Sequence, residues 1–213
     1  MKRKVTLAIA LLGLSAVPAV SMAQWSANVG WVSDYVYRGY YQEDSSASAG
    51  IDYENDSGFY IGTWGADVGD GMETDVYFGY GGGSGDFGWS IGYTGYLYTD
   101  DFDDTYTEVN LGFSYGIFAL DFASGEWDGF GAPEDYTFTS ITLSPASGPY
   151  FTFGSFGKDF DGDYFELGYG LDVNGVDLSI ALIQSDELPV TSDGGEWQLV
   201  LGLSKSIDIG GSD

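Results

Sequence analysis

Acidic side chains are the main candidates for chemistry in this sequence, because it contains no histidine and no cysteine. Among its 213 residues, 33 are aspartate or glutamate and only 6 are lysine or arginine. Histidine bases, histidine-ligated zinc sites and disulfides are therefore excluded. An enzyme built from this chain would have to use carboxylates, tyrosines or serines alone. We therefore predict that the protein is not an enzyme and has no catalytic residues and no cofactor.

Two short stretches resemble metal-binding loops. The first, DFDGD at Asp159 to Asp163, has glycine at its fourth position and Gly170 at its twelfth. An EF-hand loop needs glycine at the sixth position and glutamate at the twelfth. The second, GGGSGD at Gly81 to Asp86, has the glycines of a calcium-binding β-helix repeat but occurs only once. We interpret the first as a solvated acidic loop and the second as a turn, and predict no metal site.

One basic residue lies apart from the others. Arg38 belongs to the stretch SDYVYRGYYQ, from Ser33 to Gln42, and is the only arginine beyond the first four residues. Residues an even number apart on an extended strand share a face. Arg38 and Asp34 are therefore expected on one face of a strand, and Tyr35 and Tyr37 on the other.

The first 23 residues have the three parts of a secretory signal peptide. A basic start at residues 2–4 precedes an apolar run at 5–20 and the small-residue sequence Ser-Met-Ala at 21–23. A membrane anchor is the alternative, but the run is short for a span and is interrupted by polar residues and proline. We expect 1–23 to be removed, leaving 24–213 as one domain. That domain keeps three basic residues against all 33 acids, so nucleic acid is not an expected partner.

The mature chain alternates apolar and small or polar residues with a period of two. In the segment 196–204, for example, one tryptophan and three leucines occupy every second position. This alternation, with many aromatic and β-branched residues, predicts half-buried strands. We expect about twelve, at 25–38, 46–54, 59–66, 74–81, 87–98, 105–115, 117–124, 136–144, 149–157, 164–173, 176–185 and 196–206.

The connections between these strands alternate in length. Short turns are expected at 55–58, 81–85, 115–116, 145–148 and 174–175. Longer, acidic loops are expected at 39–45, 67–73, 99–104, 124–135, 158–163 and 186–195. Outer-membrane barrels have this asymmetry, with short periplasmic turns and long outer loops. The loop 124–135 is the best candidate to fold into the barrel, with an exposed adhesive loop as the alternative.

The two faces of the strands distinguish a membrane barrel from a soluble sandwich. A sandwich of this size would present large charged side chains on its water face, whereas the non-aromatic face here is mostly glycine, serine, threonine, alanine and asparagine. Small residues suit the inside of a closed barrel, and the other face would supply an apolar band for lipid. We therefore predict an all-β, closed, antiparallel up-and-down transmembrane β-barrel of about twelve strands. Aromatic residues near strand ends are expected either to form interface girdles or to pack as ordinary core residues: Trp31, Tyr35, Tyr37, Tyr98, Tyr136 and Trp197.

Several charged residues are expected to face the lumen. Counting by two places Asp34 and Arg38 near the outer rim, with further inward acids on other strands. Charge inside a barrel must be paired or hydrated. The complete set of pore-lining candidates is Asp34, Arg38, Glu108, Asp121, Glu166 and Asp177.

Two blocks of sequence resemble a known family. The stretches VSDYVYRG, at Val32 to Gly39, and GIDYENDSGFYIGTWGADV, at Gly50 to Val68, are similar to those of the bacterial TorF-like outer-membrane porins, also labelled Gcw_chp. This resemblance implies an outer-membrane β-barrel that passes small solutes, and it carries no catalytic role for the matching residues. The C-terminus departs from the usual pattern of such barrels, because Ile207 stands about where a final aromatic residue would fall.

Two function classes follow from the composition and the resemblance. The first is a porin in the outer membrane of a Gram-negative bacterium, reached by export through the periplasm, that passes small solutes and prefers cations. The second is a closed barrel with a structural, adhesive or cation-bridging surface role. Outer-membrane lipids and lipopolysaccharide are the expected partners in either case. Arg38 would set a constriction by bridging Asp34 and acids such as Glu108 or Glu166, or would only neutralise buried carboxylates.

Overall fold

The computed structural model describes residues 24–188, 190–191 and 194–209. The segment 1–23, for which the sequence predicts a signal peptide, lies outside the described residues. Among the residues that are described, no helix is long and apolar enough to span a membrane.

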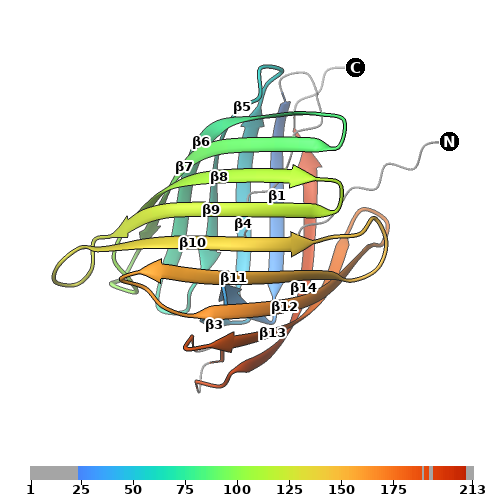
Figure 1. Cartoon of the computed structure of the whole chain (residues 1–213). Helices are drawn as coiled ribbons and strands as arrows, with labels where there is room; N and C mark the ends of the chain where they lie inside the picture. The colour runs from blue at the N-terminus through green and yellow to red at the C-terminus, as the bar shows by residue number, and fades with distance from the viewer. Residues whose placement is uncertain (1–23, 189, 192–193, 210–213) are drawn as a thin grey trace.

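Twelve antiparallel strands form a closed barrel (Figure 1). Each strand pairs with its neighbour along the chain, and β1 closes the ring by pairing with both β14 and β4. The predicted fold class is therefore confirmed. The barrel strands are β1 (Gln24–Val32), β4 (Ala47–Glu54), β5 (Phe59–Asp67), β6 (Met72–Ser84), β7 (Phe87–Tyr98), β8 (Tyr106–Tyr115), β9 (Phe118–Trp127), β10 (Glu134–Leu143), β11 (Tyr150–Lys158), β12 (Asp163–Asp172), β13 (Asp177–Asp186) and β14 (Trp197–Asp208).

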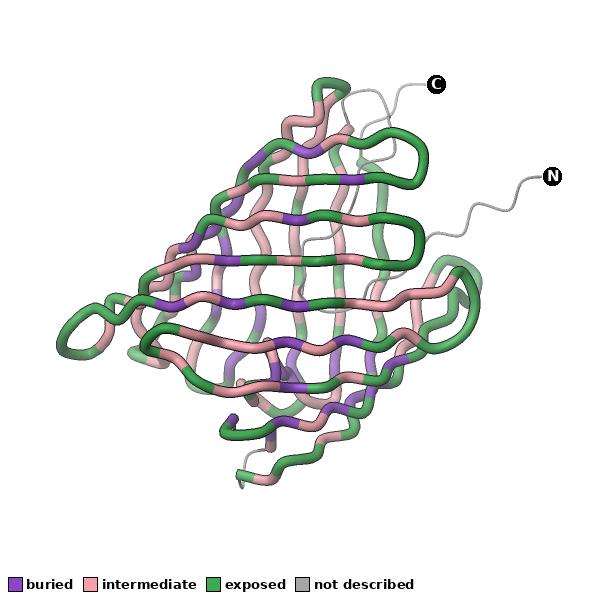
Figure 2. Tube along the Cα trace, in the orientation of Figure 1, coloured by how far each residue is buried: buried purple, intermediate pink, exposed green. Residues whose placement is uncertain are grey.

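The apolar alternation of the sequence places large hydrophobic side chains on the outside of this barrel. Along β6, exposed and buried residues alternate over most of the strand, and the same alternation runs through the wall in Figure 2. On β14, Leu199, Leu201 and Leu203 are all about half exposed. A closed ring leaves no unpaired sheet edge, so the backbone is satisfied while the outer face stays apolar.

The strand boundaries differ from the sequence expectation at several places, and two of these differences change the connections. The glycine run at 81–84 belongs to β6, so the turn shrinks to Gly85 and Asp86. The first strand ends at Val32 and not at residue 38. Pairing of β1 with β4 ends at Trp31 and Ala47, and the chain then leaves the wall.

The two ends of the barrel differ in their connections. Residues 55–58, 85–86, 116–117, 144–149 and 173–176 connect strands at one end. Ser26 pairs with Asp208 near the starting end of β1, so both ends of the described chain lie at this turn end. The loop end carries 33–46, 99–105, 128–133 and 187–196, whereas the connections at 68–71 and 159–162 are shorter than expected.

The longest connection at the loop end contains a second, two-stranded sheet. Here β2 (Asp34–Tyr37) pairs with β3 (Tyr40–Asp44). Arg38 and Gly39 join them with φ angles of 49° and 81°. Positive φ at both central residues defines a type I′ turn, whose twist matches that of a hairpin. The sequence expectation of one continuous strand to residue 38 is therefore wrong, because this turn reverses the chain.

The hairpin formed by β2 and β3 packs inside the barrel and not outside it. Its Tyr35 and Val36 join a buried apolar cluster with inward residues of the wall, among them Ala123, Phe138 and Ile183. The expectation of a lumen lined mostly by small residues therefore fails at the loop end. The segment 128–133, within the loop that we expected to fold inward, carries Phe130 with 71% of its surface exposed.

Candidate functional site

The turn of the hairpin brings Arg38 to the opposite wall of the barrel. Its two terminal nitrogens donate hydrogen bonds of 2.8 Å each to the two carboxylate oxygens of Glu108. Glu108 lies on β8, which is separated from β1 by four strands on one side and six on the other. The pair is almost completely buried, since 12% of the Arg38 side chain and none of the Glu108 side chain is exposed. The hairpin therefore reaches across the lumen.

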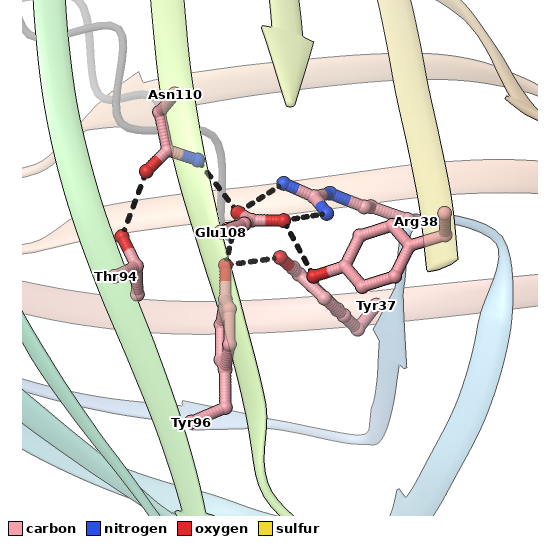
Figure 3. A network of polar contacts seen from close by, with 7 residues as sticks. Tyr37, Arg38, Thr94, Tyr96, Glu108 and Asn110 are labelled. Carbon is pink, nitrogen blue, oxygen red and sulfur yellow. Dashed lines mark hydrogen bonds and ion pairs between the residues drawn. The ribbon is translucent and has the colours of Figure 1, made fainter. Parts of the chain in front are cut away.

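Glu108 is the centre of a polar network (Figure 3). Besides Arg38, it accepts hydrogen bonds from the Tyr96 hydroxyl (2.6 Å), the Tyr136 hydroxyl (2.9 Å) and the Asn110 side-chain nitrogen (2.6 Å). Asn110 in turn accepts a hydrogen bond of 3.0 Å from Thr94. A buried carboxylate needs such donors to offset the loss of hydration. The network thus fixes the position where the arginine docks.

Aromatic rings hold the arginine from its other sides. The guanidinium carbon lies 4.3 Å from the centre of the Phe138 ring and 4.8 Å from that of Tyr37. Both distances fall within the range of cation–π attraction. The Tyr37 hydroxyl also shares a hydrogen bond of 2.7 Å with that of Tyr96. Arg38 is therefore held by charge, by hydrogen bonds and by ring faces together.

Gly39 lets the hairpin approach the wall closely. Its carbonyl oxygen accepts a 2.7 Å hydrogen bond from the Ser185 hydroxyl of β13. A Cβ atom at this position would lie only 2.6 Å from the Cβ atom of Tyr164 on β12. Glycine is required here both by the positive φ and by this contact.

Tyr35 anchors the base of the hairpin to β6. Its side chain is 1% exposed, and its hydroxyl donates a hydrogen bond of 2.9 Å to Glu73. The ring meets Trp64 of β5 edge to face, with the ring centres 6.0 Å apart. Tyr35 lies outside the twelve wall strands, and burial together with the nearby Glu73 carboxylate holds its pKa well above the usual value. The phenol therefore stays protonated and acts as a donor.

Of the six predicted lumen residues, the structure brings only Arg38 and Glu108 together. Asp34 is not a partner of Arg38 in the described hydrogen bonds, because the turn carries the arginine away. Its carboxylate accepts a 2.7 Å hydrogen bond from Ser33 instead. The predicted bridge from Arg38 to Asp34 is therefore wrong, whereas the predicted bridge to Glu108 is present.

The other three predicted residues lie on separate parts of the wall. Glu166 on β12 accepts a hydrogen bond from Tyr150. Asp121 on β9 lies opposite Gly112 in the strand pairing, and Asp177 pairs with Asp172 near the turn end. These three carboxylates are distributed through the interior and form no single site.

Four of the tyrosines near strand ends are packed residues and not girdle residues. Tyr35, Tyr37, Tyr98 and Tyr136 were expected in one of these two roles, and all four join the interior at the loop end. Their hydroxyl groups find carboxylate or phenol partners there, which a lipid-facing position would not supply. By contrast, Trp197 is 60% exposed on the outer surface, as a girdle residue would be.

Sequence reasoning also missed several interior acids, among them Glu73 and Asp75. The expected strand began at residue 74, which left Glu73 in a loop. A signal was available, because residues 72, 74, 76, 78 and 80 are methionine, threonine, valine, phenylalanine and tyrosine, which fit an outward face. The residues between them, Glu73 and Asp75 included, must then point inward.

Together these features define the class of the protein. A closed antiparallel barrel with an apolar outer face and a polar interior is a transmembrane β-barrel. The profile of the family Gcw_chp, described as a bacterial protein of unknown function, matches residues 16–211. The chain therefore belongs to the Gcw_chp family. Curated proteins gave no match to it.

Solved membrane barrels share this fold at low sequence identity. A structure from work on in-meso crystallization of membrane proteins aligns with a TM-score of 0.63 and 8% identity, covering 89% of this chain and 85% of that one. The KdgM porin aligns with a TM-score of 0.58 and 8% identity, covering 85% of this chain and 99% of that one. These similarities support the barrel fold and its strand arrangement.

Proposed function

We propose that this protein is an outer-membrane barrel of the porin type in a Gram-negative bacterium, and that it passes small solutes along an interior path narrowed by the β2–β3 hairpin. The observation that carries the proposal is the combination of an apolar outer belt with a polar interior crossed by a docked hairpin. In this proposal residues 1–23 direct export to the periplasm and are removed. Membrane lipids and lipopolysaccharide surround the barrel.

The interior on the turn side of the hairpin supports a path for solutes. Its inward positions are mostly glycine, serine, threonine and asparagine, which leave room for water. Asp121, Glu166 and Asp177 project from three different strands of this wall. Their negative charge, with the acidic loops at the other end, favours cations over anions.

The hairpin supplies the constriction in this proposal. Arg38 at its tip is the residue whose position would tune both the width and the charge of the path. Since Glu108 neutralises it, the pair presents little net charge to a passing solute. A role as a strut that only balances the Glu108 carboxylate is the alternative.

Planar-bilayer conductance of the purified full chain tests the proposal. Ser33 and Ser45 are joined by a 2.7 Å backbone hydrogen bond, so a short glycine turn can replace residues 34–44 without moving the wall. We expect cation-selective current from the natural chain and a larger current from the variant without the hairpin. Absence of current above background from both proteins would exclude a porin.

A specific observation favours a second function, a closed barrel with a structural or adhesive surface role. The apolar cluster at the loop end includes Val32, Val36 and Val200, with exposures between 3% and 9%. Such packing resembles a plug more than a water-filled mouth. Liposome swelling in neutral sugars distinguishes the two functions, because only an open path admits solute. Swelling restricted to the variant without the hairpin would favour the closed barrel.

A further inference from the structure

Two buried carboxylates beneath the hairpin each have one oxygen without a hydrogen-bond partner. Glu73 and Asp75 alternate on the inward face of β6 and are only 1% and 4% exposed. One oxygen of each, Oε2 of Glu73 and Oδ1 of Asp75, is buried and has no hydrogen-bond partner. Buried polar atoms are nearly always satisfied, so each exception needs a physical cause.

The two carboxyl groups are also direct neighbours. They stand two residues apart on the same face of β6, which places their side chains side by side, and each acts on the charge of the other. Two ionised carboxylates can only accept hydrogen bonds, so a hydrogen bond between them requires a proton on one of them. Two negative charges this close in a dry interior would otherwise repel strongly.

The surrounding groups do not supply a free positive charge. Among the described residues, Arg38 is the basic side chain that acts on Asp75, and both of its terminal nitrogens are engaged by Glu108. Within the described chain, no group of three or more acidic side chains is arranged to hold a metal ion. The ionisable groups that face the pair, from the hairpin, β6, β7, β8 and the β7–β8 loop, are Tyr35, Arg38, Tyr77, Tyr96, Tyr98, Asp103 and Glu108.

We propose that Glu73 and Asp75 form a binding site for one shared proton, and that this proton keeps the β2–β3 hairpin docked in the barrel. The link to the hairpin is direct, because the Tyr35 hydroxyl caps Glu73. Tyr35 is itself 1% exposed, so this part of the docked hairpin and the pair are buried together.

Burial of the pair by the docked hairpin determines whether docking strengthens or weakens as pH rises. The docked state holds one more proton than an undocked state in which water reaches the pair and both acids ionise. Docking therefore weakens as pH rises through the range in which the pair loses its proton. The hairpin would leave the lumen under alkaline conditions and return on acidification.

Limited proteolysis with trypsin measures docking without any ion current. Trypsin cleaves after arginine and lysine, and Arg38 lies at the hairpin tip with 12% of its side chain exposed. Lys158, with 42% of its side chain exposed, serves as an internal reference that cancels the pH dependence of the protease. The protein in detergent is digested between about pH 6 and about pH 9. We expect the ratio of cleavage at Arg38 to cleavage at Lys158 to rise with pH, with a limiting slope of about tenfold per pH unit.

Amide substitutions identify the responsible groups. Asp75→Asn places a permanent hydrogen-bond donor beside Glu73, so the hairpin should stay protected from trypsin at every pH. Glu73→Gln should have the same effect, because it places a permanent donor beside Asp75. Asp52→Asn is the matched control, since this interior acid of β4 is hydrogen-bonded by Asn28 and Tyr77 and not by the hairpin. The control should keep the natural pH dependence. Heat-modifiable migration in gels shows that each variant is folded.

Three outcomes would overturn the proposal: a cleavage ratio that does not change with pH, a natural pH dependence in both amide variants, or its loss in the Asp52→Asn control. A pH-dependent ratio in a protein that conducts no ions would leave the proton site intact and overturn only the porin function.

Discussion

At the residue scale, the Arg38–Glu108 pair is a buried ionic contact between the hairpin and the wall. Removal of either partner of this buried pair strongly destabilises the fold, because the remaining charge stays buried without a counter-charge. An exposed pair in the same chain offers a comparison. Lys158 and Asp135 are 3.9 Å apart, with 42% and 61% of their side chains exposed. Water and salt screen such a pair and leave it little net energy.

The change Glu108→Gln should destabilise the folded barrel by about 3 to 5 kcal/mol, because Arg38 would lose its counter-charge. Lys158→Ala should change stability by less than about 1 kcal/mol. Urea unfolding in detergent micelles, followed by tryptophan fluorescence, measures both. Equal effects of the two substitutions would show that the buried pair has no special role.

Arg38→Ala separates the two roles considered for the arginine. Changed ion selectivity with natural heat resistance would identify a constriction, because the charge would then matter to the solute. Reduced folding with natural selectivity in the surviving fraction would identify a strut. Reversal potentials under a salt gradient and heat-modifiable migration in gels give the two readings.

Gly39 gives a third prediction at this scale. Gly39→Ala should weaken docking through two causes, the positive φ of 81° and the contact of 2.6 Å between the new Cβ and that of Tyr164. Gly175→Ala shares only the first, since φ is 79° and no atom lies within 4 Å of the Cβ position. Positive φ alone costs about 1 to 2 kcal/mol. Trypsin cleavage at Arg38 should increase in the Gly39 variant and stay natural in the Gly175 variant.

At the element scale, the two faces of each strand have different environments. On β14, Leu201 points outward and is 47% exposed, while Gln198 belongs to the opposite face. Leu201→Arg should lower the free energy of unfolding in lipid by about 2 to 4 kcal/mol if the residue lies near the bilayer midplane. Gln198→Arg should have a much smaller effect, because the charge faces the interior. Refolding yields in lipid vesicles test this, and equal losses for both variants would contradict the assigned faces.

The hairpin shows that a segment with the alternation of a barrel strand need not belong to the barrel wall. Residues 33–38 have the alternation of a barrel strand, yet the turn at Arg38 and Gly39 folds them into a separate sheet. A chain that continued along the wall would leave Tyr35 and Tyr37 facing lipid. In the lumen their hydroxyl groups reach Glu73 and Tyr96 instead.

At the scale of the whole molecule, the excess of acids predicts how ion selectivity responds to salt. The chain has a formal net charge of −27. The Debye length falls from about 10 Å at 0.1 M salt to about 3 Å at 1 M. Cation preference should therefore weaken markedly between these concentrations, as measured by reversal potentials. A cation preference that does not change with salt concentration would indicate that selectivity arises from residues within the constriction and not from the overall charge.

Sequence periodicity by itself determined most of the architecture. Twelve strands, their order and the two unlike ends follow from an alternation that only a closed, lipid-facing sheet accommodates well. The face of Glu108 was also predictable, because the alternation of β8 is regular. These are local or pairwise properties, and the side-chain period of two carries them directly.

Only the tertiary structure decided what occupies the interior. The reversal at Arg38 requires two residues with positive φ, which a non-glycine residue adopts only when its surroundings hold it there. Those surroundings are Glu108, Phe138 and Ser185, from strands far apart in the sequence. The burial of one unsatisfied oxygen on each of Glu73 and Asp75 likewise appears only in the folded barrel. Periodicity assigns a side chain to a face, but the hydrogen bonds that hold the hairpin depend on which strands meet across the lumen.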